Sequence, residues 1–173
     1  MIKNKKGFTL IELLVVLGLS AAIVSLVMKF FMVNINNYET ISNDTELQFQ
    51  SQYILNFMSN KIMESSKIEG IKENAVIHID HIGEQKITKV SFRYGTFFME
   101  CYNFEFRNSK IMYGKNAPEE SANTELGVYI KEIRMEPVPE TSTFKNAKAV
   151  KIKIVLLKGN ELYEACQTAN MRN

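Results

Sequence analysis

Two histidines close together are the first side chains in the sequence with the chemistry of a metal site. His78, Asp80 and His81 form an H-x-D-H stretch, and imidazole and carboxylate groups are common zinc ligands. In an extended strand, however, His78 and His81 point to opposite faces because their separation is odd, and Asp80 shares a face with His78 only. We therefore expect a surface strand end here and no bound metal.

Other catalytic arrangements are missing from the sequence. There is no G-x-S-x-G motif and no glycine-rich phosphate loop, and neither Cys101 nor Cys166 has an obvious histidine partner. We predict that the chain is not an enzyme and that it needs no cofactor.

The same two cysteines, Cys101 and Cys166, allow one disulfide and lack the paired spacing of a zinc site. If the domain is exported, a bridge between them would close a long loop and contribute about 2–4 kcal/mol. The sequence leaves two alternatives open at this point, a bridge or two buried thiols.

A basic stretch near the C-terminus raises the question of nucleic-acid binding. It contains Lys145, Lys148, Lys151 and Lys153, of which the last two share one face of a strand. The whole chain has a formal net charge of only +2, which gives no reason to expect general nucleic-acid binding. We expect the lysines to protect a solvated sheet edge, with DNA contact as the alternative.

Glu12 is the charged residue in the least favourable setting. It is the only charge in the apolar run 8–28, which at about 1.5 Å per helical residue spans roughly 30 Å, the thickness of a bilayer's hydrocarbon core. A carboxylate there costs on the order of 2.5–3.5 kcal/mol at mid-bilayer, so a cationic partner is expected. Lys3, Lys5 and Lys6 precede the run.

Three interpretations of this N-terminal segment compete. A secretory signal would end at a small-residue cleavage site, for which residues 20–22 (SAA) are suitable. A plain membrane anchor would place the three lysines on the cytoplasmic side. Neither interpretation gives Glu12 a partner.

The third interpretation gives Glu12 a partner. The stretch KKGFTLIELL, residues 5–14, resembles the N-terminal signature of type IV pilins and pseudopilins. The resemblance implies that a prepilin peptidase cuts between Gly7 and Phe8 and that Phe8 is then N-methylated. It also implies that Glu12 pairs with the Phe8 amine of a neighbouring subunit, which would neutralise both charges in a low-dielectric setting.

The resemblance further implies three parts: a leader over residues 1–7, a transmembrane and assembly helix over 8–33, and a pilin-like globular domain over 34–173 that includes the second half of the helix. Before assembly the protein would be a single-pass protein of the cytoplasmic membrane with its domain outside. After assembly it would lie in a pilus or related filament at the cell surface. Its partners would be the prepilin peptidase, other major and minor pilin subunits, and the membrane.

One residue departs from the pattern of major pilins, which usually have a helix-kinking Pro where this chain has Lys29. A second, looser resemblance is to the J-type minor pseudopilins. We therefore expect a minor pilin with a structural role in priming or at the tip, the alternative being a tip module that contacts DNA, a surface or secreted cargo. The stretches that carry this second resemblance are VSFRY (90–94), YNFEFRNSKIMYG (102–114), the strand around 130–135, AVKIKIVLL (149–157) and NMRN (170–173).

The elements that must position these residues follow from periodicity. Neither Gly nor Pro occurs between Gly18 and Gly70, so we expect one helix from about Phe8 to about Ser66, followed by a loop over 67–74. Apolar residues recur at helical spacing along its second half, namely Leu47, Ile54, Phe57, Met58 and Ile62.

Beyond the helix the period changes to two. Strands are predicted over 75–81, 88–94, 96–106, 110–113, 128–136, 149–158 and 162–168, with polar loops over 114–126 and 137–146. Phe97, Phe98, Tyr102, Phe104 and Phe106 are expected to face the core. A leading helix followed only by strands predicts an α+β fold in which the second half of the helix packs on an antiparallel sheet. This order also fits the pilin family.

Overall fold

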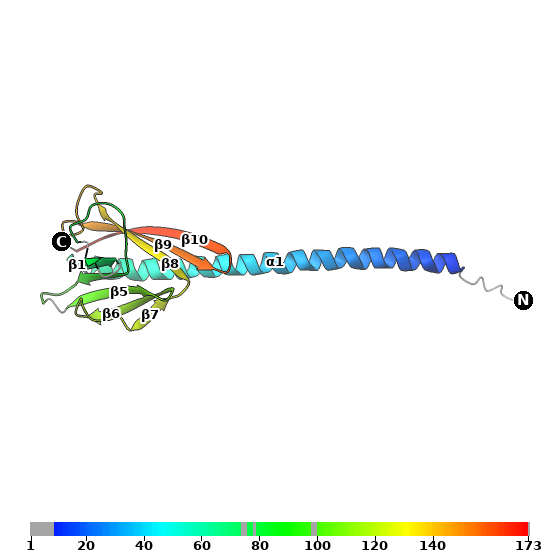
Figure 1. The fold of residues 1–173 in the computed structure, drawn as a ribbon, viewed down its shortest axis with the longest axis horizontal. Helices are drawn as coiled ribbons and strands as arrows, with labels where there is room; N and C mark the ends of the chain where they lie inside the picture. Colours follow the sequence, from blue (N-terminus) through cyan, green and yellow to red (C-terminus); the bar gives the residue numbers. More distant parts are fainter. Residues whose placement is uncertain (1–8, 74–75, 78, 98–99, 173) are drawn as a thin grey trace, which may run out of the picture. The chain divides into compact units, whose positions relative to one another are not determined.

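The computed structural model describes residues 9–73, 76–77, 79–97 and 100–172. Within them the chain forms one helix and then strands only (Figure 1). The elements are α1 (Leu10–Met63), β1 (Lys67–Glu73), β2 (Val76–Ile77), β3 (Gln85–Lys86), β4 (Lys89–Arg93), β5 (Cys101–Arg107), β6 (Lys110–Asn116), β7 (Thr124–Gly127), β8 (Ile130–Val138), β9 (Ala149–Lys158) and β10 (Glu161–Asn170).

Two compact units divide the chain, Met1–Ser42 and Asn43–Asn173. In the first unit the described residues are Thr9 and the first part of α1, and every one of them is exposed. The second unit contains the rest of α1, whose first fully buried residue is Leu47, together with all the strands. Burial along α1 therefore begins where the helix joins the strand-rich unit.

The strands form two antiparallel sheets. One has six strands in the order β2-β1-β4-β5-β6-β7, and the other has four in the order β10-β9-β8-β3. The chain first enters the second sheet at β3, returns to the first at β4, and passes to the second again between β7 and β8, where Tyr129 has a positive φ of 65°. Most strands that follow one another in the chain pair directly, and β3 and the crossing before β8 connect the two sheets.

The core of the second unit lies where α1 meets the inner faces of both sheets. Met58 of α1 is fully buried beside Phe104 of the six-stranded sheet and Ile133 of the four-stranded sheet. The ring of Phe57 lies 4.9 Å from that of Tyr113, centroid to centroid, in an edge-on contact. Burying each such large apolar side chain contributes about 1.5–3 kcal/mol, so the helix is held from both sheets.

Gly127 of strand β7 packs against α1. A Cβ atom at this position would lie 2.5 Å from Cδ1 of Ile54, which is itself fully buried. Only a residue without a side chain fits beside Ile54 without displacing it.

The predicted α+β fold, with a long helix on antiparallel strands, is confirmed. The strand over 149–158 is confirmed with its bounds, as β9. The helix ends at Met63, three residues before the predicted end. The prediction of a single sheet was wrong, because the chain turns away from the first sheet at Tyr129 and β8, β9 and β10 form a second sheet together with β3.

Residues 67–74 were predicted to be a loop, and most of them form strand β1. The pairing of β1 with β4 shifts register between Ile68 and Gly70. Because of that bulge, the buried residues Ile68 and Ile71 are three positions apart instead of two, and the strand has no period-two signal.

Two other predicted boundaries were wrong. The loop predicted over 114–126 contains the end of β6 and most of β7. The strand predicted from residue 96 begins only at Cys101, because Tyr94 N–H donates to the Glu100 carbonyl and closes a turn. Phe97 lies in that turn and is 73% exposed, so its predicted core position was wrong, and Phe98 lies outside the described residues. Tyr102 and Phe104 are buried as predicted.

The short strand β3 was not predicted at all, and at residues 79–80 the chain turns instead of continuing the strand predicted over 75–81. Strand β8 extends to Val138, past the predicted end at residue 136, and so includes Pro137.

Candidate functional site

The start of α1 holds Glu12 by a reciprocal set of hydrogen bonds with Thr9. The backbone N–H and the hydroxyl of Thr9 both donate to Oε2 of Glu12, each at 2.9 Å. In return the backbone N–H of Glu12 donates to the Thr9 hydroxyl oxygen at 3.3 Å. This is a capping box, in which a Thr before the first turn and a Glu three residues later satisfy each other's backbone groups.

The capping box changes the interpretation of the carboxylate. Oε2 of Glu12 is occupied within the chain, whereas Oε1 accepts no hydrogen bond among the described residues. Glu12 also lies in the first turn of α1, where the helix dipole favours a negative charge. The site therefore fixes the position of one carboxylate and leaves one of its oxygens available to a cation.

Gly7 and Phe8, the predicted cleavage and methylation residues, lie outside the described residues. The roles assigned to them, and the pairing of Glu12 with the amine of Phe8, stay predictions. The capping box itself was not predicted, although the pattern T-x-x-E at 9–12 was visible in the sequence. The sequence indicated a partner for this carboxylate in a neighbouring subunit, and the hydrogen bonds within the chain were missed.

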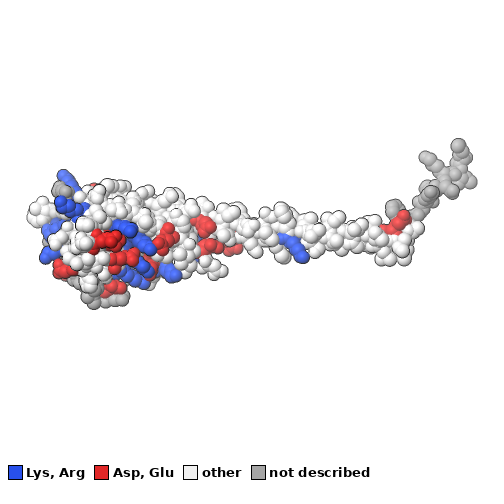
Figure 2. All heavy atoms as spheres, turned by 90° about the horizontal axis from the view of Figure 1, so that it is seen from above, with Lys and Arg blue, Asp and Glu red and all other residues white. Residues whose placement is uncertain are grey.

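After Glu12, the helix presents a long and mainly apolar surface. Large apolar side chains from Leu10 to Val33 are 47–81% exposed, and α1 is long and apolar enough to cross a membrane. Between Phe8 and Tyr38 only Glu12 and Lys29 are charged. In Figure 2 most of the coloured acidic and basic side chains gather over the second unit, and few lie on the described part of the first.

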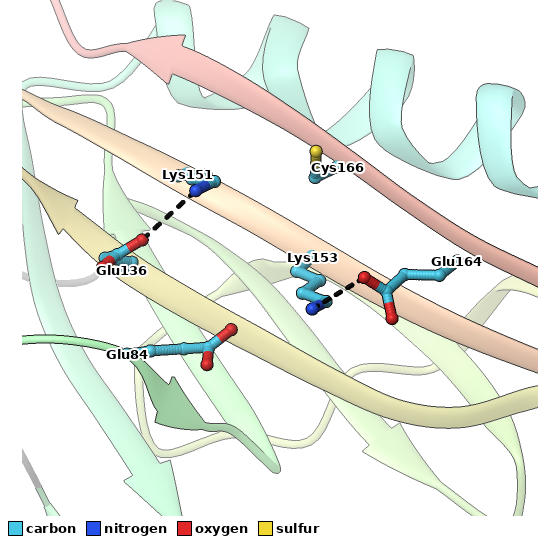
Figure 3. A pocket seen from close by; sticks show the side chains of 6 residues that line it. All are labelled: Glu84, Glu136, Lys151, Lys153, Glu164 and Cys166. Carbon is cyan, nitrogen blue, oxygen red and sulfur yellow. Dashed lines mark ion pairs between the residues drawn. The ribbon is translucent and has the colours of Figure 1, made fainter.

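The four-stranded sheet has a charged outer face with a cavity of about 400 Å³. Lys153 Nζ lies 2.7 Å from a carboxylate oxygen of Glu164, and Lys151 Nζ lies 3.5 Å from one of Glu136. Figure 3 shows these lysines extending from β9 toward carboxylates on the two neighbouring strands. The two lysines share a face as predicted, but each is paired with an acid.

The prediction that these lysines protect a sheet edge was wrong. They lie on β9, which is flanked by β8 and β10 and is therefore an inner strand. Both alternatives considered from the sequence lose support, because the cations are neither at an edge nor gathered into an unbalanced basic patch. Lys145 and Lys148 lie before β9, in the connection from β8.

The two cysteines lie in different sheets. Cys101 is fully buried in β5 of the six-stranded sheet, and burial raises the pKa of its thiol. Cys166 is exposed on β10 of the four-stranded sheet. No disulfide joins these two described residues.

The histidine stretch forms no metal centre that the structure describes. His81 lies after a turn, where its Nδ1 is 3.5 Å from Nε2 of Gln85. His78 lies outside the described residues. Among the described side chains no three from His, Cys, Asp and Glu come together in a way that could hold a metal ion.

Comparison with known families gives one match. The family described as the prokaryotic N-terminal methylation motif matches residues 2–28, the segment that contains the capping box. No curated protein and no solved structure matches the chain. The chain thus carries the N-terminal methylation motif of the type IV pilins and pseudopilins, ahead of an α+β domain of pilin-like architecture.

Proposed function

We propose that the chain is a minor pilin or pseudopilin, an assembly subunit that primes or caps a type IV pilus or a related secretion or DNA-uptake filament. The observation that carries the proposal is the position of Glu12. Its carboxylate is fixed by Thr9 at the start of an exposed apolar helix, inside the matched motif.

The chemistry of assembly follows from that position. Removal of the leader after Gly7 creates a cationic amine at Phe8, and Glu12 supplies the counter-charge to the amine of a neighbouring subunit. In a membrane or a helix bundle the dielectric constant is low, so this attraction is much stronger than in water and orients the incoming subunit. The capping box supports this role, because it already holds the carboxylate in one position before the partner arrives.

Lys29 supports a minor subunit over a major one. It places a cation in a helical segment whose other exposed residues, from Leu13 to Tyr38, are uncharged. A lysine at the end of a membrane span can reach the interface with its long side chain. In a bundle built from many copies, each copy would bury that charge at a considerable cost. The looser resemblance of residues 90–94 and 102–114 to J-type minor pseudopilins agrees.

The proposal places the protein first in the cytoplasmic membrane as a single-pass protein with its domain outside, and then in a filament at the cell surface. Its partners are the prepilin peptidase, for which it is a substrate, and other major and minor pilin subunits. Its role is structural, without catalysis.

The test measures filaments in the protein's own cell. A deletion strain should lose most filaments, the unaltered gene should restore them, and the Glu12→Leu variant should not. Glu12→Asp, which keeps the charge, is the matched control and should restore assembly in part. Quantitative mass spectrometry of purified filaments should find this chain at a small fraction of the most abundant subunit. If the chain were the most abundant subunit, or if its deletion left filament number unchanged, the proposal would be wrong.

A further inference from the structure

Strand β10 is much longer than the other outer strands in the described part of the sheets. The two sheets end at β2, β7, β3 and β10. β2 and β3 have two residues each and β7 has four, whereas β10 has ten. Soluble proteins usually keep exposed edges short, because a long edge offers a row of backbone donors and acceptors to another chain.

The hydrogen-bond alternation shows which groups of β10 face outward. The N–H of Met171 donates to the Lys148 carbonyl at 2.8 Å, continuing the register with β9. In an antiparallel pair, alternate residues bond to the partner strand, so Ala169 and every second residue before it bond to β9. The outward groups therefore belong to Leu162, Glu164, Cys166, Thr168 and Asn170.

These outward groups are open along most of the strand. Arg172 N–H donates to the Ser65 carbonyl at 2.6 Å, so the edge is covered just beyond Asn170. From Leu162 to Asn170 the outward backbone groups make no hydrogen bond among the described residues, and their side chains are exposed. Ten successive pairs with β9 run without a register shift, and β10 contains no Pro, Lys or Arg. Strand β10 thus lacks three of the usual protections of an edge, which are short length, a bulge and a Pro or Lys.

The flanking side chains indicate what the edge would accept. On the side that faces the core, Tyr163 and Ala165 are only partly buried, so apolar residues of an added strand would complete their burial. On the outer side lie Glu164, Cys166 and the cavity of about 400 Å³ (Figure 3). The strand itself carries two glutamates and no basic residue. Glu164 pairs with Lys153 through Oε1, but its side chain is half exposed, so it can accept a second cation, which favours a basic partner.

We propose that the open edge of β10 binds an extended, basic polypeptide segment with alternating apolar and polar residues, which adds to the four-stranded sheet as a further strand. The apolar residues of the segment cover Tyr163 and Ala165, and its basic residues lie on the outer side near Glu164. This inference goes beyond the proposed function and does not depend on it.

The test uses the full-length chain in detergent micelles and a capped synthetic heptapeptide that alternates valine with lysine and threonine. Residue-resolved hydrogen exchange is measured without and with millimolar peptide. The outward amides of Glu164, Cys166 and Thr168 should exchange at least ~10-fold more slowly with peptide. The amides of Tyr163 and Ala165, already bonded to β9, serve as internal controls and should change little.

Two further peptides and two variants sharpen the result. The same peptide N-methylated at alternate residues cannot complete the backbone ladder and should give no protection. A version with glutamate in place of lysine should bind more weakly. Cys166→Pro removes one outward N–H and should abolish protection, while Cys166→Ser keeps that N–H and should bind as the unaltered chain does.

The proposal is overturned if the heptapeptide leaves the outward amides unprotected, or if the N-methylated peptide protects them equally well. These comparisons hold even if Cys166→Pro fails to fold. Protection that rises with the concentration of the chain alone, together with dimerisation in analytical ultracentrifugation, would instead show that a second copy occupies the edge. Because no filament is involved, failure here leaves the proposed function standing.

Discussion

The phenol of Tyr102 donates a hydrogen bond of 2.5 Å to the carboxylate of Glu64 and so connects β5 to the residue that follows α1. Lys61 Nζ lies 2.9 Å from the other oxygen of that carboxylate. The ring of Tyr94 stacks on that of Tyr102 with the centroids 4.4 Å apart. This contact ties the end of the long helix to the middle of the six-stranded sheet.

The bond predicts a pH-dependent contribution to stability. Hydrogen bonds from Tyr102 and Lys61 hold the pKa of Glu64 below its ordinary value. Because folding lowers this pKa, the contribution is complete above the unfolded value of about 4.3 and is lost as the pH falls below it through the folded value. Tyr102→Phe should therefore cost about 1 kcal/mol at pH 7, an amount reduced by the exposure of Glu64, and progressively less as the pH falls below about 4.3.

Denaturant unfolding across this pH range measures the effect. Tyr94→Phe is the matched control, because it removes a hydroxyl that is not part of the Tyr102–Glu64 hydrogen bond. Both variants keep the two stacked aromatic rings. An equal loss for Tyr102→Phe at pH 7 and pH 3 would contradict the prediction.

A substitution at Gly127 should be rescued by shortening Ile54. Gly127→Ala places a Cβ atom 2.5 Å from Cδ1 of Ile54 and should destabilise the chain by about 1–3 kcal/mol. Ile54→Val removes Cδ1 and keeps Cγ1, which lies 2.8 Å from the added Cβ atom. The rescue is therefore partial, and the double variant should be more stable than the sum of the two single losses by about 0.5–1 kcal/mol. Gly70→Ala, which meets no atom within 4 Å, is the control. Strict additivity in thermal or denaturant unfolding would show that the two positions do not touch.

Thiol titration distinguishes the two cysteines. The native chain should react with a maleimide reagent at Cys166 only, since Cys101 is fully buried and reactivity requires access to the thiolate. Unfolding in guanidinium should expose a second thiol. Mass spectrometry of the labelled peptides gives the positions. A native protein with no reactive thiol, which gains two after reduction, would instead establish the bridge between Cys101 and Cys166.

The capping box predicts a difference between two substitutions at Thr9. Thr9→Ser keeps the hydroxyl that donates to Glu12 and accepts from its N–H, whereas Thr9→Val removes both bonds. Loss of such a cap costs about 1 kcal/mol of helix stability. Amide exchange of residues 10–13 in micelles should be about 5-fold faster in Thr9→Val and unchanged in Thr9→Ser. Equal exchange in both variants would show that the hydroxyl does not hold the first turn.

Local features of the fold were predictable from sequence because they depend on residues close together. The long helix follows from the absence of Gly and Pro between Gly18 and Gly70, and β9 follows from its alternation of lysine with Ile152 and Ile154. Strand order was not predictable. Lys151 and Lys153 lie on an inner strand because β9 pairs with both β8 and β10. No local pattern in the sequence encodes that pairing.

The missed features share one cause, which is a local signal that departs from the usual residue type or spacing. Tyr129 adopts the positive φ at the crossing between the sheets, where a glycine would have marked the change of direction. The bulge in β1 separates Ile68 from Ile71 by three residues and hides the strand. At the candidate site Glu12 was recognised from its charge in an apolar run and from the signature at residues 5–14, and its bonds to Thr9 became apparent only in the structure.

The N-terminus of the mature protein tests the central claim most directly. Protein isolated from the membranes of its own cell should begin at Phe8, with one methyl group on the amine, as seen by intact mass and by sequencing of the N-terminal peptide. A Gly7→Arg variant should keep the leader and stay out of filaments, which gives the matched control for processing. A mature protein that begins at Ala22 or Ile23 would instead establish an ordinary secretory signal and contradict the account of Glu12 as a filament residue.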